Sequence, residues 1–243
     1  MVRKAITAAL VVAGLLGAAI NAVAASDSVP PSTAGTDGGL RFRRARVQVR
    51  VYDTTVMSAA GQTVALRAAT GVLAAAGIDI TWLVCGMTDE SANPGACATR
   101  LTRDELAVRL VRLAGTPSAR GRLSLGYSLL DMSTGGGTLA TVYVDRVEWL
   151  VSHARNSQSP TPNSQSALSI QILGFAVAHE VGHLLLGTNT HAAAGLMRAV
   201  WSPSELQRND LADWLFSAAD SLAMSRALEQ RQAQLAANIA WTK

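Results

Sequence analysis

The feature that most constrains this chain is a pair of histidines four residues apart, His179 and His183, with Glu180 directly after the first. Residues with this spacing lie on one side of an α-helix, about one turn apart. Both imidazoles could therefore bind one zinc ion, while Glu180 could take a proton from metal-bound water. The pattern ends an apolar run, 167–186, where unpaired imidazoles and a carboxylate would be costly to bury. The segment predicts a helix that carries a zinc site.

A catalytic zinc usually has three protein ligands and an open position for water. Gly187 follows the apolar run, and a glycine here would end the helix in a left-handed conformation. His191 could then return to the metal as the third ligand, because the chain would reverse at the glycine. The alternative is a carboxylate from a later helix, either Glu205 or Asp210. We favour His191, because Glu205 already has an expected role in capping that helix.

This set of residues predicts a zinc hydrolase in which Glu180 acts as the general base. The interpretation that we favour is a secreted zinc metallopeptidase that hydrolyses peptide bonds in peptide or protein substrates. One alternative is a zinc hydrolase of a non-peptide amide or a cell-wall substrate. Another is a non-catalytic binding protein, although neither the glutamate nor a histidine of the pattern is missing.

The first residues have the pattern of a targeting segment. Arg3 and Lys4 precede an apolar run, 5–20, and small residues at 22–24 suit a signal peptidase. We therefore expect a signal peptide over 1–24, a flexible leader rich in Ser, Pro, Thr and Gly over 25–40, and a catalytic domain over 41–243. The expected location is secreted or periplasmic, without stable membrane association after cleavage. An uncleaved N-terminal anchor is the alternative.

The charge of the chain gives no indication of a polyanionic partner. The formal net charge is +4, and two of those positive charges would leave with the signal peptide. Arginines cluster over 41–50, but no aromatic residues interleave with them as they would in a surface that stacks nucleic-acid bases. We therefore expect no nucleic-acid partner.

Cys85 and Cys97 are the only two cysteines of the chain. In an exported protein, a pair that closes a short loop is most simply a disulfide. The residues between them are polar and contain a turn sequence, Asn93-Pro94-Gly95. Zinc binding by this pair is the less favoured alternative, because no histidine lies near it in the sequence.

Strand and helix patterns alternate in the first half of the expected domain, and helical patterns dominate the second half. The expected strands span 47–52, 78–84, 123–130 and 138–144, and the expected helices span 61–76, 102–115, 145–153, 167–186 and 202 to the C-terminus. This order predicts a single α+β domain with a small mixed sheet, an active-site helix and a long C-terminal helix.

Three of these expectations are specific enough to be tested closely. Thr102 and Glu105 form a capping box that should open a helix, and Ser202 and Glu205 form another that should open the last helix.

Strand 138–144 comes shortly before the zinc pattern and follows a run of glycines. We expect it at the edge of the sheet above the cleft, where an extended substrate could add to it.

The segment from His179 to Met197 resembles the metzincin clan of zinc peptidases. Their pattern is His-Glu-x-x-His-x-x-Gly-x-x-His, followed by a methionine turn beneath the metal, and this chain has one extra residue on each side of Gly187. The resemblance implies a zincin-like fold and a zinc cofactor. It implies that His179, His183 and His191 are the ligands, that Glu180 is the base and that Met197 is the turn methionine.

The chain also resembles uncharacterised secreted bacterial proteins that share several sequence blocks. The blocks are Ala76-Gly77-Ile78 to Trp82 with Cys85, then Val142 to Val147, and a site block from His179 through Gly195-Leu196-Met197-Arg198 to Trp201. This wider resemblance covers most of the expected domain, and it implies only a fold like that of zinc peptidases.

Overall fold

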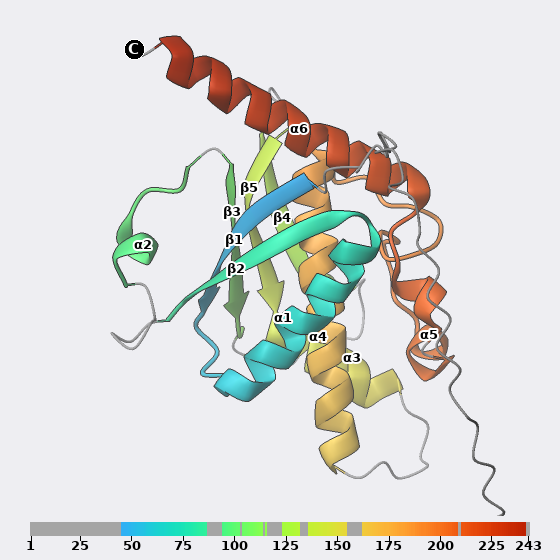
Figure 1. Cartoon of the computed structure of the whole chain (residues 1–243). Coiled ribbons are helices and arrows are strands. Elements are labelled where there is room, and N and C mark those ends of the chain that lie inside the picture. The colour runs from blue at the N-terminus through green and yellow to red at the C-terminus, as the bar shows by residue number, and fades with distance from the viewer. Residues whose placement is uncertain are drawn as a thin grey trace, which may run out of the picture. The chain divides into compact units, whose positions relative to one another are not determined.

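The computed structural model describes residues 45–86, 94–102, 104–113, 115, 123–131, 136–154, 162–208 and 210–241 (Figure 1). The predicted signal peptide, 1–24, and the predicted leader, 25–40, lie outside the described residues, so both remain predictions.

The described strands form one five-stranded mixed sheet with the order β2-β1-β3-β5-β4. Neighbouring strands are parallel except for β4, which is antiparallel to β5. The strands are β1 (Ala45–Asp53), β2 (Ile78–Cys85), β3 (Glu105–Val111), β4 (Gly126–Asp131) and β5 (Gly136–Tyr143). Their apolar β-branched and leucine residues form much of the core. The predicted α+β class with a small mixed sheet is confirmed.

Helices α1 (Ala59–Ala75) and α4 (Pro162–Leu186) pack against each other on one face of this sheet (Figure 1). Gly174 lies where the two helices cross, and a Cβ atom added there would collide with the carbonyl oxygen of Ala65. The close crossing holds α4 in the centre of the domain. Residues 172–185 of α4 are all buried, which fits the long apolar run of the sequence.

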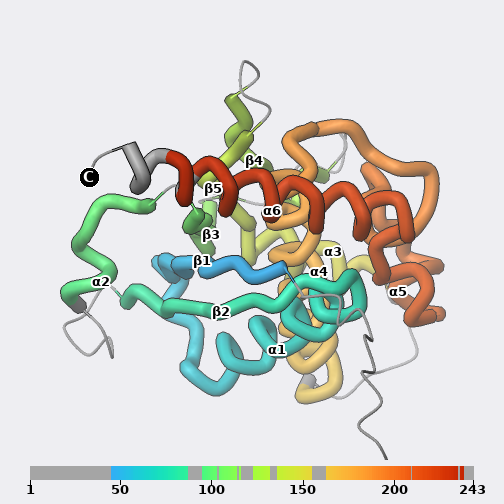
Figure 2. Tube along the Cα trace, turned by 45° about the horizontal axis from the view of Figure 1, so that its top comes forward, coloured from blue at the N-terminus to red at the C-terminus, as the bar shows by residue number. Residues whose placement is uncertain are grey.

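The remaining elements surround this core. They are α2 (Pro94–Ala98), α3 (Val144–Ala154), α5 (Pro203–Arg208), the short 3-10 helix η1 (Leu211–Trp214) and α6 (Ala218–Trp241). Figure 2 shows α6 running across the domain. Arg231 of α6 donates hydrogen bonds to the carbonyls of Leu184 in α4, at 2.8 Å, and Gly137 in β5, at 3.2 Å. One of the last carbonyls of α4, that of Leu184, thereby gains a partner.

The predicted helix over 102–115 is wrong, because this segment forms β3. One bond of the capping box forms, since Glu105 accepts from the Thr102 N–H at 2.9 Å, but the Thr102 hydroxyl donates to the same carboxylate instead of accepting from the Glu105 N–H. The residues that follow are nevertheless buried between β1 and β5. Hydrogen bonding of this segment to β1 on one side and β5 on the other therefore outweighs the helical preference of its local sequence.

Two further expectations need correction. The predicted single helix from 202 to the C-terminus is three elements, α5, η1 and α6, separated by extended residues. The strand predicted over 138–144 is β5, which lies between β3 and β4 and is not an edge strand. The edge strand on this side is β4.

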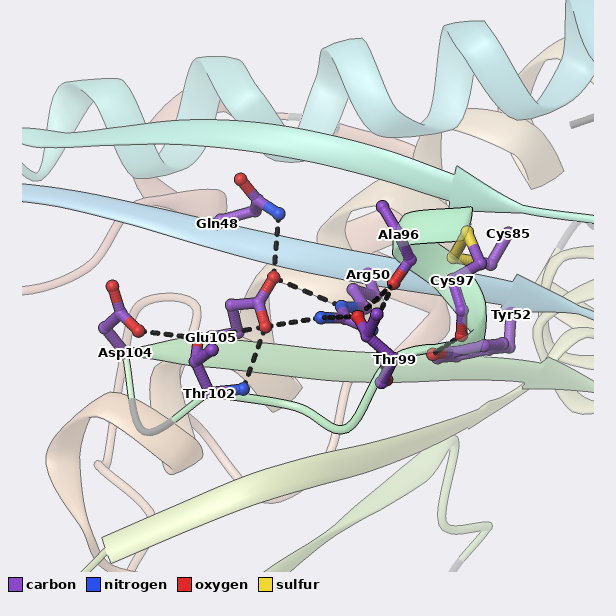
Figure 3. Close-up of polar contacts among 10 residues, drawn as sticks. All are labelled: Gln48, Arg50, Tyr52, Cys85, Ala96, Cys97, Thr99, Thr102, Asp104 and Glu105. Atoms are coloured by element: carbon purple, nitrogen blue, oxygen red, sulfur yellow. Dashed lines mark hydrogen bonds and ion pairs between the residues drawn. A yellow bond between two sulfur atoms is a disulfide. The ribbon is translucent and has the colours of Figure 1, made fainter. Parts of the chain in front are cut away.

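A polar cluster covers the face of β1 that points away from the core (Figure 3). Arg50 and Glu105 are buried and form an ion pair with a 2.6 Å separation between Arg50 Nη2 and Glu105 Oε2. Arg50 also donates to the carbonyls of Ala96 and Thr99, at 2.7 and 2.8 Å. The predicted disulfide between Cys85 and Cys97 is present beside it, with a Cα–Cα distance of 5.6 Å. Together these contacts fasten the segment around α2 to the sheet.

We expect Arg50→Met to lower the free energy of unfolding by about 3–5 kcal/mol, because it leaves the buried Glu105 carboxylate without its cation. Burial raises the pKa of Glu105, but the hydrogen bonds from Arg50 and Thr102 together lower it below its ordinary value. Denaturant unfolding measures the loss. A double variant, Arg50→Met with Glu105→Leu, should recover part of it, and equal stability of Arg50→Met and the parent would contradict the assignment.

Candidate active site

His179 and His183 lie one turn apart on α4, and each side chain is fixed by a backbone carbonyl. The Nδ1 atom of His179 is 2.8 Å from the carbonyl oxygen of Leu196. The Nδ1 atom of His183 is 2.7 Å from the carbonyl oxygen of Thr188. A carbonyl can only accept, so each Nδ1 carries the proton and donates. Both Nε2 atoms are then left with a free lone pair, which is the form of imidazole that binds a metal.

His191 lies beside these two histidines. Gly187 has a φ of +66° and its N–H donates to the His183 carbonyl at 2.9 Å, so the helix ends there in the expected left-handed turn. The chain then reverses. His183 Nε2 lies 3.0 Å from His179 Nε2 and 3.3 Å from His191 Nε2.

The three imidazoles form a group that could hold a metal ion. One nitrogen from each ring lies within 4.8 Å of the others. Tetrahedral zinc holds nitrogens at 2.0–2.1 Å, which places them about 3.3 Å from one another. The Nε2 separations of 3.0 and 3.3 Å from His183 are close to this value. Burial, and then the nearby His183, lowers the pKa of His179 to about 3, which keeps its imidazole neutral.

The acidic alternatives for the third ligand have other partners. Glu205 forms an ion pair with Arg198 at 2.9 Å and accepts from the Ser202 N–H at 2.6 Å. Asp210 accepts from the Ala212 N–H at 3.0 Å and so caps η1. The described group of possible metal ligands contains His179, His183 and His191 and neither acid.

We expect His191→Ala to weaken zinc binding by at least tenfold, while Glu205→Ala and Asp210→Ala bind zinc as the parent does. The reason is that only the histidine directs a nitrogen at the other two imidazoles. Competition with a fluorescent chelator measures the affinities. Unchanged affinity in His191→Ala, with a loss in either acidic variant, would overturn the choice of third ligand.

Glu180 is buried next to the histidines and contacts strand β4. The Ser128 hydroxyl lies 2.8 Å from Glu180 Oε2 and 2.9 Å from the Glu180 carbonyl oxygen, and it donates to this pair of acceptors. Burial raises the pKa of Glu180 to about 7, and the hydrogen bond from Ser128 acts in the opposite direction. A carboxyl group whose pKa lies close to neutral pH suits a general base.

Residues 195–198, which follow the third histidine, pack against α4 and are called the floor of the site. Gly195 has a φ of +74°, and the next residue, Leu196, supplies the carbonyl that holds His179. Met197 is buried, and its sulfur lies close to Gly182, where an added Cβ would come within 2.9 Å of it. The same Cβ would lie 2.6 Å from the Phe216 ring, so a side chain at 182 would collide with both residues.

Sequence reasoning gave no role to Arg198, which ties this floor together. Its side chain is buried and its Nη1 atom donates to the carbonyls of Gly195, at 2.7 Å, and Asp213, at 2.5 Å. Its guanidinium also lies over the Trp214 ring, 5.2 Å from the ring centre. These contacts, with the ion pair to Glu205, join the floor to α5 and η1.

A cleft of about 790 Å³ opens beside the histidines and Glu180. Its polar lining includes Ser124, Ser128 and Asn189. The apolar lining comes from several elements and includes Leu125, Leu150, Ala176, Val200 and Trp201. The candidate metal ligands and the candidate base therefore face a space large enough for part of a substrate.

No protein-family model and no curated protein sequence matches this chain. Among solved structures, one similar chain is archaemetzincin from Methanopyrus kandleri. The two are 15% identical with a TM-score of 0.45, and the match covers 77% of this chain and 98% of that chain. The function proposed below therefore rests on the residues of this chain.

Proposed function

We propose that this chain is an exported zinc peptidase of the zincin-like kind, with His179, His183 and His191 as the zinc ligands and Glu180 as the general base. The observation that carries the proposal is a group of three imidazole nitrogens, all within 4.8 Å of one another, beside a buried carboxylate at an open cleft. Three neutral nitrogen ligands and an accessible fourth position are typical of catalytic zinc, whereas structural zinc sites are closed.

Zinc bound there would lower the pKa of a water molecule and polarise the carbonyl group of the scissile bond. Glu180 would take the proton of the attacking water and deliver it to the leaving amine. The carbonyls of Leu196 and Thr188 would keep the imidazoles of His179 and His183 in the tautomer that the metal requires. The floor around Met197 would hold the Leu196 carbonyl in place.

A peptide is the substrate that the surroundings of the site favour. The edge strand β4 lines the cleft through Gly126, Tyr127 and Ser128. An extended peptide could pair with the main-chain groups that such an edge turns outward, among which the Gly126 carbonyl now accepts from the Ser124 hydroxyl. The apolar residues of the cleft would take an apolar side chain of that peptide.

Export is supported by the disulfide between Cys85 and Cys97, because such bonds persist in oxidising compartments. The proposed signal peptide over 1–24 would direct the chain there. We place the mature protein outside the cytoplasm, in the periplasm or the medium.

The proposal is tested by metal analysis of the purified mature protein together with a peptide-library cleavage assay. We expect one zinc per chain, cleavage of peptides, loss of cleavage with a chelator and recovery when zinc is added back. Cleavage that continues at the same rate in metal-free protein would overturn the mechanism. Zinc-loaded protein that hydrolyses only amides outside peptides would overturn the substrate class.

A further inference from the structure

Strand β4 presents two small residues to Glu180. Successive side chains of a strand point to opposite faces, so Gly126 and Ser128 share the face that Tyr127 does not. Both are next to the Glu180 carboxylate. The Ser128 hydroxyl donates to Oε2, and a Cβ atom added to Gly126 would lie 2.7 Å from Oε1. A larger residue at 126 would displace the carboxylate or the strand.

The same two residues turn their main-chain groups towards the open edge of the sheet. The Tyr143 N–H donates to the Leu125 carbonyl at 2.8 Å, and Tyr127 pairs with Thr141 in the antiparallel ladder. Residues of an antiparallel strand direct their N–H and C=O groups alternately to one side and the other. Gly126 and Ser128 therefore direct theirs away from β5, where a peptide added to β4 would lie.

We propose that Ser128 is a positioning residue for the Glu180 base, and that β4 couples the docking of a peptide to the orientation of this carboxylate. The inference rests on the proposed peptidase function. The Ser128 hydroxyl holds Oε2, and among the described residues none donates a hydrogen bond to Oε1. The fixed oxygen sets the rotation of the carboxylate and leaves the other oxygen to accept a proton. A peptide paired with the backbone of residue 128 would keep that hydroxyl in place.

The test compares Ser128→Ala, Ser128→Thr and a control, Leu129→Ala, in zinc-loaded protein. Leu129 is the next residue of β4, is half exposed and points to the other face of the strand. We expect Ser128→Ala to keep one zinc per chain and a KM within about threefold of the parent, while kcat falls roughly tenfold to a hundredfold, the range expected for a lost hydrogen bond to a charged group. Ser128→Thr, which retains the hydroxyl, should restore most of the kcat, and Leu129→Ala should match the parent.

Crystal structures of zinc-loaded parent, Ser128→Ala and Ser128→Thr protein give a second measurement that needs no turnover. The Glu180 carboxylate should rotate away from β4 in Ser128→Ala and keep its place in Ser128→Thr. An unmoved carboxylate and an unchanged kcat in Ser128→Ala would overturn the positioning role. If the parent binds zinc but cleaves no peptide, the proposed function fails, and the position of the carboxylate still decides the role of Ser128.

Discussion

Glu180→Gln protein is expected to keep one zinc per chain and to lose turnover by roughly 10²- to 10⁴-fold, the usual contribution of a positioned general base. Glutamine has the same shape as glutamate, and its carbonyl oxygen can still accept the hydrogen bond from Ser128. It cannot take a proton from water at neutral pH. The zinc ligands are unchanged, so this variant should bind zinc as the parent does while its turnover falls.

Metal analysis and steady-state kinetics with a peptide substrate measure both effects in the same preparation. A matched control is Glu148→Gln, which makes the same chemical change on α3. Glu148 is exposed there and forms an ion pair with Arg112. The control should retain the zinc and the turnover of the parent. Peptide hydrolysis by Glu180→Gln at the parental rate would show that another group is the base.

His183→Ala should lose stoichiometric zinc altogether. Its Nε2 atom lies between those of the other two imidazoles, 3.0 and 3.3 Å away, so its removal leaves two ligands that are further apart. The loss should also be visible in stability. Zinc at a thousand times its Kd stabilises the folded state by about 4.1 kcal/mol, and this corresponds to about 8–16 °C in Tm for a domain of this size.

Thermal unfolding with and without a chelator tests this second expectation. The chelator should lower the Tm of the parent by that amount and leave the Tm of His183→Ala where it was. His153→Ala is the control, because His153 is exposed on α3 and lies against Trp149, outside the cleft. It should bind zinc and respond to the chelator as the parent does. Full zinc content in His183→Ala would contradict the assignment of this ligand.

The features of this site that could be predicted from the sequence are local along the chain. A spacing of four residues in a helix places His179 beside His183, and a glycine in the left-handed region brings His191 back after eight residues. The disulfide was predictable for the same reason, since only two cysteines exist and they are twelve residues apart. In each case the geometry follows from the conformation of one short segment.

Features that depend on pairing between distant segments could not be predicted in this way. Both β4 and β5 have strand patterns, but nothing in either pattern indicates which of them has a second neighbour. Glu105 forms one of the predicted bonds to Thr102, yet it also pairs with Arg50, which is 55 residues away in the sequence, and the segment becomes a strand. Ser128 is 52 residues from Glu180, so their contact appears only once the sheet and α4 have packed together.

The three candidate ligands differ in how firmly the fold holds them, and this has a consequence for how metal affinity can be altered. His179 and His183 lie in the part of α4 that is buried on every side, whereas His191 lies on an exposed loop that returns to the floor through the hydrogen bond from Ala192 to Met197. Two candidate ligands thus belong to the buried core of the domain and one to its surface. Of the three candidate ligands, His191 is therefore the one whose position depends on a surface loop, so substitutions in that loop should alter metal affinity without disturbing the core.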